Sequence, residues 1–242
     1  VTLTDRPGPT TTHRQNLADP RLQEALLSIL PPDGVEVDIE STLPVGRGMG
    51  SSAALAVALG RASMAREGIE ATEEELDARA FKVETIFHGN PSGIDHTVSM
   101  RGGAVCYRRT QTGPLFEPVH LPDLSIVVID SGQAGDTAEM VAQVAQRRPA
   151  VDEALSHMGE LLHATLPALL AGDLPAIGKA WIKNHRLLQD VGVSNRRLDE
   201  IVSLAMTAGA TGAKLAGAGG GGVVIALAHR PNDIVEAAKS AG

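Results

Sequence analysis

Residues 44–54 read PVGRGMGSSAA, a glycine-rich turn between a predicted strand and a predicted helix. Before the turn, residues 35–40 read VEVDIE, and their strict alternation of apolar and polar side chains predicts a half-buried strand. After the turn, residues 51–65 are rich in alanine and leucine and predict a helix. A glycine turn that leads into a helix is a typical anion site. A plain turn capped by serine explains the same residues equally well.

The residue types in this turn suit a phosphate group. The first N–H groups of a helix lack intrahelical partners and lie at the positive end of its dipole. Gly46, Gly48 and Gly50 lack Cβ atoms, so a phosphate can approach the backbone closely. Ser51 and Ser52 can cap the helix, and a hydroxyl there can also reach Mg²⁺. The turn is no Walker A loop, because no lysine follows the last glycine, and its G-x-G-x-G-S-S spacing differs from the dinucleotide fingerprint.

A second turn, FHGNPSGID at residues 87–95, ends in the carboxylate of Asp95. Eleven positions earlier, Glu84 falls in the last turn of a predicted helix, where a carboxylate opposes the helix dipole and favours a nearby cation. Glu84, Ser52 and a nucleotide phosphate can share one Mg²⁺, an ion that prefers oxygen ligands. Asp95 can then accept or orient the proton of an attacking hydroxyl. The alternative is an Asx turn at Asp95 and a Glu84 side chain that points to water.

Another glycine run, KLAGAGGGG at residues 214–222, lies between apolar stretches. A flexible linker is normally flanked by polar sequence. The apolar flanks therefore favour a buried run whose backbone is pressed against a ligand or another loop, with a linker as the alternative. Lys214 can neutralise a phosphate, but a lysine at the start of a strand is more often a surface residue.

Composition excludes several classes of protein. The chain has 242 residues, of which 43% are hydrophobic and 21% charged, so it can bury the core of one large domain or two small ones. A net charge of −8 argues against nucleic-acid backbones and anionic membranes as partners. The single cysteine, Cys106, excludes an internal disulfide and favours a reducing compartment. No apolar run approaches the ~20 residues that cross a bilayer.

Hydrophobic patterns along the chain predict an α+β protein in two parts, with a boundary near residues 121–124. The polar residues 1–18 predict a loop, and residues 88–103 predict an irregular segment. The apolar run at 124–130 predicts a buried strand. Further helices are expected at about 20–30, 72–87, 137–147, 149–171, 173–190, 195–208 and from 231, and further strands at about 103–108, 213–217 and 222–227.

The glycine turn, the carboxylate turn and the second glycine run, in this order, resemble the GHMP kinases, the superfamily of galactokinase, homoserine kinase, mevalonate kinase and phosphomevalonate kinase. Residues 44–54 match the superfamily pattern P-x-G-x-G-x-G-S-S-A-A, and residues 214–222 match K-L-x-G-A-G-G-G-G with alanine at 216. HGNPSGID at 88–95, the glycine pair at 102–103 and DSGQAGDT at 130–137 are most similar to the mevalonate kinase branch. The resemblance covers about residues 34–228.

The resemblance implies a role for each matching residue. Asp95 is the expected catalytic residue, and Ser52 and Glu84 are the expected Mg²⁺ ligands. The expected cofactor, ATP, binds its triphosphate at residues 46–53, and the second glycine run backs that loop. Ser92 and Thr137 are expected near the substrate and phosphates. The nucleotide-binding set comprises Gly46, Gly48, Gly50, Ser51, Ser52, Ala53, Gly217, Gly219 and Gly220.

The same resemblance implies the whole enzyme's activity and architecture. The expected reaction is transfer of the ATP γ-phosphoryl group to the primary hydroxyl of mevalonate, and the expected assembly is a homodimer. The composition adds the expectations of a cytoplasmic location and of no nucleic-acid or membrane partner. Residues 1–122 are the expected N-terminal domain, similar to ribosomal protein S5 domain 2, and residues 123–242 the expected C-terminal ferredoxin-like domain with extra helices. The alternatives are another acceptor, such as homoserine or phosphomevalonate, and a non-catalytic nucleotide-binding remnant.

The sequence departs from the family pattern at its beginning. Family members begin with a strand that carries P-x-K-x-x-L-x-G-E-H, and nothing before Ser41 resembles it. Since the sequence also starts at Val1, we expect an N-terminally shortened chain. A smaller departure is Arg47, where alanine is common in the family. Its side chain can meet either a phosphate or solvent.

Overall fold

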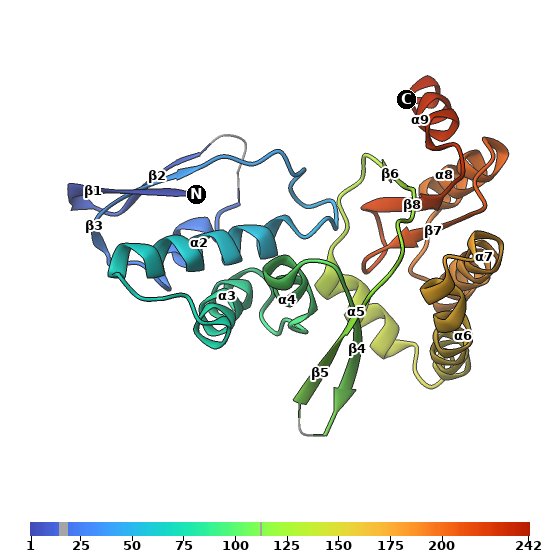
Figure 1. Cartoon of the computed structure of the whole chain (residues 1–242), viewed down its shortest axis with the longest axis horizontal. Coiled ribbons are helices and arrows are strands. Elements are labelled where there is room, and N and C mark those ends of the chain that lie inside the picture. Colours follow the sequence, from blue (N-terminus) through green and yellow to red (C-terminus); the bar gives the residue numbers. More distant parts are fainter. Residues whose placement is uncertain (15–18, 112) are drawn as a thin grey trace. The chain divides into compact units, whose positions relative to one another are not determined.

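The computed structural model describes residues 1–14, 19–111 and 113–242 and confirms the α+β class. The chain forms two compact units (Figure 1). The first unit comprises Val1–Val45 and Gly50–Pro118, and the second comprises Gly46–Met49 and Val119–Gly242. Among the described residues, the first unit contains two sheets and the second contains one, and each unit has its own hydrophobic core.

The first unit is built on a three-stranded sheet of order β1-β3-β2. Its elements are β1 (Thr2–Pro9), β2 (Thr11–Arg14), α1 (Leu22–Leu27), β3 (Asp33–Ile39), α2 (Ser51–Glu67), α3 (Glu73–His88), α4 (Ile94–Arg101), β4 (Ala104–Thr110) and β5 (Gly113–Val119). The predicted alternating strand is confirmed as β3, whose Val35, Val37 and Ile39 are buried in the core. Glu36 is buried too, beside the guanidinium of Arg6 at 2.5 Å.

The prediction of a loop over residues 1–18 is wrong for the part that the structure describes, and residues 15–18 lie outside the described residues. β1 pairs antiparallel with β3, from Thr2 opposite Asp38 to Asp5 opposite Val35, and β2 pairs parallel with β3 on its other side. Most side chains of β1 are exposed. A strand held mainly by backbone hydrogen bonds has no hydrophobic pattern that a sequence analysis can detect.

Two further differences concern short elements. The segment predicted to be irregular contains α4, which begins after Gly93, a residue with φ +86°. β5, which forms a two-stranded sheet with β4, was not expected, because Pro114 and Pro118 weaken the strand pattern there. In contrast, the predicted helix start at Thr72 is confirmed, since its side chain accepts a hydrogen bond from the Glu75 N–H at 3.3 Å.

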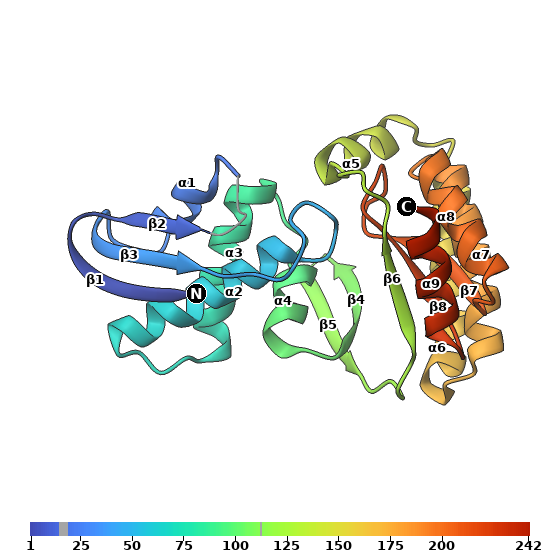
Figure 2. The same ribbon diagram turned by 90° about the horizontal axis from the view of Figure 1, so that it is seen from above.

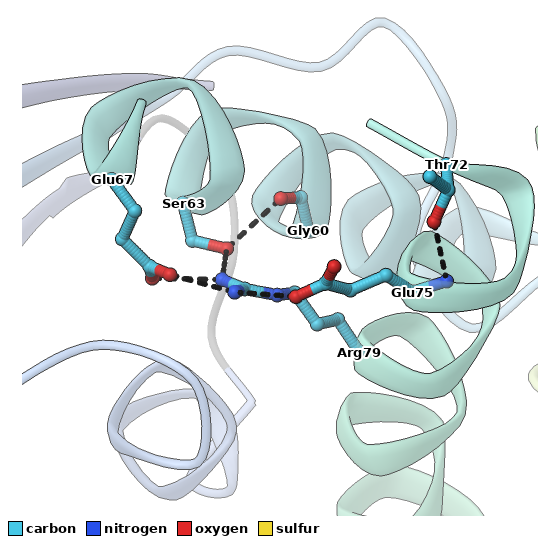
Figure 3. A network of polar contacts seen from close by, with 6 residues as sticks. All are labelled: Gly60, Ser63, Glu67, Thr72, Glu75 and Arg79. Atoms are coloured by element: carbon cyan, nitrogen blue, oxygen red, sulfur yellow. Dashed lines mark hydrogen bonds and ion pairs between the residues drawn. The ribbon is translucent and has the colours of Figure 1, made fainter. Parts of the chain in front are cut away.

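A polar clamp joins α2 to α3 (Figure 3). The Arg79 guanidinium of α3 donates to both carboxylate oxygens of Glu67 on α2, at 2.8 and 2.7 Å, and to the Ser63 hydroxyl at 2.8 Å. The hydrogen-bonded Glu67 carboxylate raises the pKa of Arg79. Bidentate pairs of this kind fix orientation as well as distance. The clamp therefore sets the relative position of the two helices that carry Ser52 and Glu84.

The second unit is built on an antiparallel sheet of order β6-β8-β7. Its elements are β6 (Ile126–Asp130), α5 (Thr137–Gln146), α6 (Asp152–Ala171), α7 (Leu174–Val191), α8 (Arg196–Thr207), β7 (Gly212–Ala216), β8 (Val223–Leu227) and α9 (Pro231–Ala241). The core packs Val127, Leu215 and Val224 of the sheet with Leu198 of α8 and Ile234 of α9. These helices lie along one face of the sheet (Figure 2).

The apolar run at 124–130 forms a strand, as predicted, but the strand is only partly buried. β6 lies at an edge of the sheet. Val127 is buried, whereas Ile126 and Val128 are 43% and 46% exposed, because alternate side chains of a strand point to opposite faces. The continuous apolar run predicted that both faces of this strand are buried. Only the face that carries Val127 is buried in the structure.

Candidate active site

The glycine turn leads into the N-terminus of α2. Gly46, Gly48 and Gly50 all have φ between +70° and +72°, and a Cβ added at any of them would meet no described atom within 4 Å. Gly50 is the N-cap, and no side chain of a described residue caps the helix. Ser51 and Ser52 are therefore the first two helical residues, and the expected serine cap is wrong. The first N–H groups of α2 remain without a capping side chain, as an anion site requires.

Glu84 lies in the last turn of α3 and is 1% exposed, so the alternative in which it points to water is wrong. Its Oε1 has no hydrogen-bond partner among the described residues. Burial raises the pKa of the Glu84 carboxyl, while the neighbouring His88 and Ser52 act in the opposite direction. A buried carboxylate with one unpaired oxygen is costly unless a cation or a proton satisfies it.

His88 links Glu84 to Ser52. Its Nε2 lies 3.0 Å from the Ser52 hydroxyl and 3.9 Å from Glu84 Oε2. His88 has no function predicted from the sequence, although its spacing of four residues from Glu84 on a helix is a detectable signal. The structure thus brings together the two expected metal ligands, Ser52 and Glu84, through a third side chain that sequence reasoning missed.

Asp95 lies in the first turn of α4 and is exposed. Its negative charge is close enough to raise the pKa of Glu84. The turn before it is held by Ser92, whose hydroxyl accepts a hydrogen bond from the Ile94 N–H at 3.3 Å. The first unit therefore carries an accessible carboxylate near the Ser52–His88–Glu84 group.

These residues fit a divalent cation of the Mg²⁺ type. Within the described ranges no group of three or more His, Cys, Asp or Glu side chains forms a metal-binding cluster. Mg²⁺ is often bound through only one or two protein oxygens together with phosphates and water. The unpaired, buried Glu84 oxygen and the nearby Ser52 hydroxyl form such a two-oxygen set.

In the second unit, the second glycine run is packed, so the linker alternative is wrong. A Cβ at Gly219 would lie 2.1 Å from the Val193 carbonyl oxygen, and one at Gly221 would lie 2.7 Å from that of Gln133. The Gly220 and Gly222 N–H groups donate to these same two carbonyls at 2.8 Å. Glycine is required here because another loop lies against the backbone.

The remaining predicted residues are also placed in the second unit. Arg47 forms an ion pair with Asp130, with Nε 3.4 Å from Oδ2, so its side chain does not meet solvent alone. A Cβ at Gly222 would lie 3.1 Å from the Arg47 carbonyl oxygen. Thr137 is the exposed first residue of α5. Lys214 is half-buried, contrary to the surface position expected, and burial lowers its pKa.

His185 of α7 is a buried histidine of the second unit. It is 5% exposed and lies between α7 and β7. Its Nδ1 accepts a hydrogen bond from the Leu215 N–H at 3.3 Å, and its Nε2 lies 3.0 Å from Asp199. Burial lowers the pKa of His185, and the hydrogen bond to Asp199 opposes this.

Two family models match the chain. The GHMP kinases N terminal domain matches residues 16–103, and the GHMP kinases C terminal model matches residues 165–242. Among the described residues, no helix is both long and apolar enough to cross a membrane.

Curated relatives and a solved structure agree with these models. The chain is 42% identical to mevalonate kinase of Pyrococcus horikoshii and 40% identical to that of Thermococcus gammatolerans, over 86% of this chain and 64% of each relative. It therefore spans less than two thirds of the length of these relatives. The crystal structure of L. major mevalonate kinase in complex with R-mevalonate superposes with a TM-score of 0.85 and 30% identity, over 98% of this chain and 81% of that chain.

Proposed function

The chain belongs to the GHMP kinases, and we propose that it transfers the γ-phosphoryl group of ATP to the primary hydroxyl of mevalonate. The observation that carries the proposal is the group formed by Ser52, His88 and Glu84 beside the exposed Asp95. The curated relatives, which are named mevalonate kinase, support mevalonate as the acceptor.

Each residue of the first unit has a chemical task in this proposal. The uncapped N–H groups of α2 bind phosphate oxygens. Ser52 and Glu84 hold Mg²⁺, which neutralises charge on the phosphates when it is bound. Asp95 orients the acceptor hydroxyl and accepts its proton. Because phosphoryl transfer needs little covalent help from the protein, positioning and electrostatics account for most of the catalysis.

The wider arrangement is proposed from the resemblance. Residues 1–122 act as the N-terminal, ATP-binding domain and residues 123–242 as the C-terminal domain. Ser92 and Thr137 contact the substrate or its phosphates, and Gly217, Gly219 and Gly220 support the phosphate loop. A cytoplasmic location and a homodimer belong to the same proposal.

The test is acceptor-dependent ADP formation by the chain with Mg-ATP. Mevalonate, phosphomevalonate and homoserine are supplied in parallel, and the product is identified by mass. Of the three acceptors, we expect only mevalonate to give ADP, and the second product should be phosphomevalonate. ADP formation with a different acceptor would assign another substrate to the site. Binding of Mg-ATP without turnover of any acceptor would contradict the proposed activity and favour a nucleotide-binding remnant.

A further inference from the structure

His88 occupies the space between the two proposed metal ligands. Its Nε2 is 3.0 Å from the Ser52 hydroxyl oxygen and 3.9 Å from Glu84 Oε2, so one ring nitrogen faces both. We propose that His88 is a positioning residue that accepts the Ser52 hydroxyl hydrogen and thereby directs the oxygen lone pairs of Ser52 to the cation. This inference rests on the proposed function, because it assumes that the cation binds at Ser52 and Glu84.

The geometry of α3 fixes the imidazole in this place. Glu84 and His88 are four residues apart and lie on the same face of the helix. His88 is the last residue of α3, and the chain turns immediately after it, where the Asn90 N–H donates to the His88 carbonyl at 2.8 Å. The side chain is 37% exposed, and its Nε2 faces Ser52.

The hydrogen-bonding capacity of Ser52 explains why a partner is needed. A serine hydroxyl has one hydrogen and two lone pairs. When a lone pair binds a cation, the hydrogen must point elsewhere, to an acceptor. The Glu84 carboxylate also lies within hydrogen-bonding reach of Ser52, but as a metal ligand its oxygens face the cation. His88 Nε2 is then the acceptor that remains at hydrogen-bond distance.

Partners that orient a metal ligand typically contribute about 10–100-fold to metal affinity. The experiment titrates Mn²⁺, in place of Mg²⁺, into the folded chain with a non-hydrolysable ATP analogue, and follows free Mn²⁺ by electron paramagnetic resonance. The variants are Ser52→Ala, Glu84→Gln, His88→Ala and the double variant Ser52→Ala/His88→Ala. A further variant is His88→Gln, whose side-chain oxygen can take the place of Nε2. The matched control is His157→Ala, which alters an exposed histidine of α6. Binding of the analogue in EDTA is measured for each.

We expect His88→Ala to weaken Mn²⁺ binding about tenfold or more, with unchanged binding of the analogue in EDTA. His88→Gln should recover most of the affinity. Adding His88→Ala to Ser52→Ala should cause no further loss, because His88 acts through Ser52. The inference is overturned if His88→Ala binds Mn²⁺ like the wild type, or if its effect is undiminished without the serine hydroxyl.

The same Mn²⁺ titrations distinguish a failure of this inference from a failure of the proposed metal site. If Ser52→Ala and Glu84→Gln both bind Mn²⁺ as tightly as the wild type, the metal site itself is wrong, and the role of His88 is wrong with it. If both weaken binding and His88→Ala does not, the metal site stands and the inference about His88 alone fails.

Discussion

Glu84 combines a structural cost with a proposed function. Its carboxylate is buried, and one of its oxygens has no hydrogen-bond partner among the described residues. From its place near the end of a helix and from the family pattern, the sequence predicts a metal-ligand role for Glu84, and that role stays a prediction. The sequence could not predict the burial, because the side chain is covered only once α2, α3 and α4 have packed together.

Glu84→Gln should therefore stabilise the protein in the absence of metal. Glutamine keeps the shape and removes the buried charge, so we expect a gain of about 1–3 kcal/mol in the free energy of unfolding at pH 7. Burial raises the pKa of Glu84, so the folded chain binds this proton more tightly than the unfolded chain. The gain should therefore be lost below the usual pKa of 4.5, where both states are protonated.

Urea denaturation of both proteins at several pH values measures this effect. Mg²⁺ with ATP should stabilise the wild type more than Glu84→Gln. Glu74→Gln is a suitable control, since Glu74 lies in the exposed first turn of the same helix. A Glu84→Gln protein less stable than the wild type at pH 7 would show that the carboxylate is satisfied by a contact not identified in the structure.

Asp95→Asn should affect catalysis and leave nucleotide binding intact. An amide cannot accept the hydroxyl proton, so we expect turnover to fall by a factor of about 10²–10⁴. The Kd for Mg-ATP, measured by calorimetry, should change little, because Asp95 is not one of the proposed metal ligands. Near-normal turnover would remove Asp95 from the proposed mechanism.

Helices and core strands were largely predictable, whereas strands without an apolar pattern were not. The alternation in β3 and the capping residue Thr72 are local signals, and both elements form where expected. β1 and β5 consist of exposed or proline-containing residues and depend on backbone pairing with a distant or neighbouring strand. Their existence is decided by tertiary contacts that a local pattern does not encode.

The loop between β7 and β8 should be among the least tolerant of substitution. Gly219 has φ +89°, and an added Cβ would lie 2.1 Å from a backbone carbonyl oxygen, so Gly219→Ala should cost about 2 kcal/mol or more. Gly159 is the matched control. It lies exposed within α6 with no atom within 4 Å of an added Cβ, so Gly159→Ala should gain about 0.5–1 kcal/mol. Thermal unfolding compares the two, and equal effects would contradict the packing described.

The contact between α7 and β7 should weaken in mild acid. Burial lowers the pKa of His185, so the unfolded chain binds this proton more tightly than the folded chain. Its contribution to stability is then fully present above the usual pKa of 6.5 and is lost as the pH falls below that value.

The decline should not exceed about 1.4 kcal/mol per pH unit for this one group. Urea midpoints between pH 7 and 5 measure the decline, which should be shallower for His185→Gln. His157→Ala should retain the wild-type slope, because that side chain is exposed. An unchanged slope in His185→Gln would assign the acid sensitivity to other groups.

Two separate cores predict that the two units respond differently to core mutations. Leu59 is fully buried in the first core, and Leu59→Ala should cost the first unit about 2–5 kcal/mol. The free energy of opening measured by amide hydrogen exchange in α2 and α3 should fall by this full amount. Trp181, the single tryptophan, lies on α7 of the second unit, and its fluorescence transition in urea should move less.

Ile201→Ala, in the second core, provides the reciprocal control and should reverse this pattern. Equal shifts in both probes for both variants would show that the chain unfolds as a single cooperative unit.

The Arg79 clamp has a consequence for how tightly a cation can be held. The two proposed ligand oxygens come from different helices, α2 and α3. If these helices moved relative to each other, binding of an ion would first have to fix their relative position. The bidentate contact between Arg79 and Glu67 fixes the relative position of α2 and α3 before an ion binds (Figure 3). The entropic cost of bringing the two ligands together is thus met when the protein folds. An incoming ion then binds to a preorganised site.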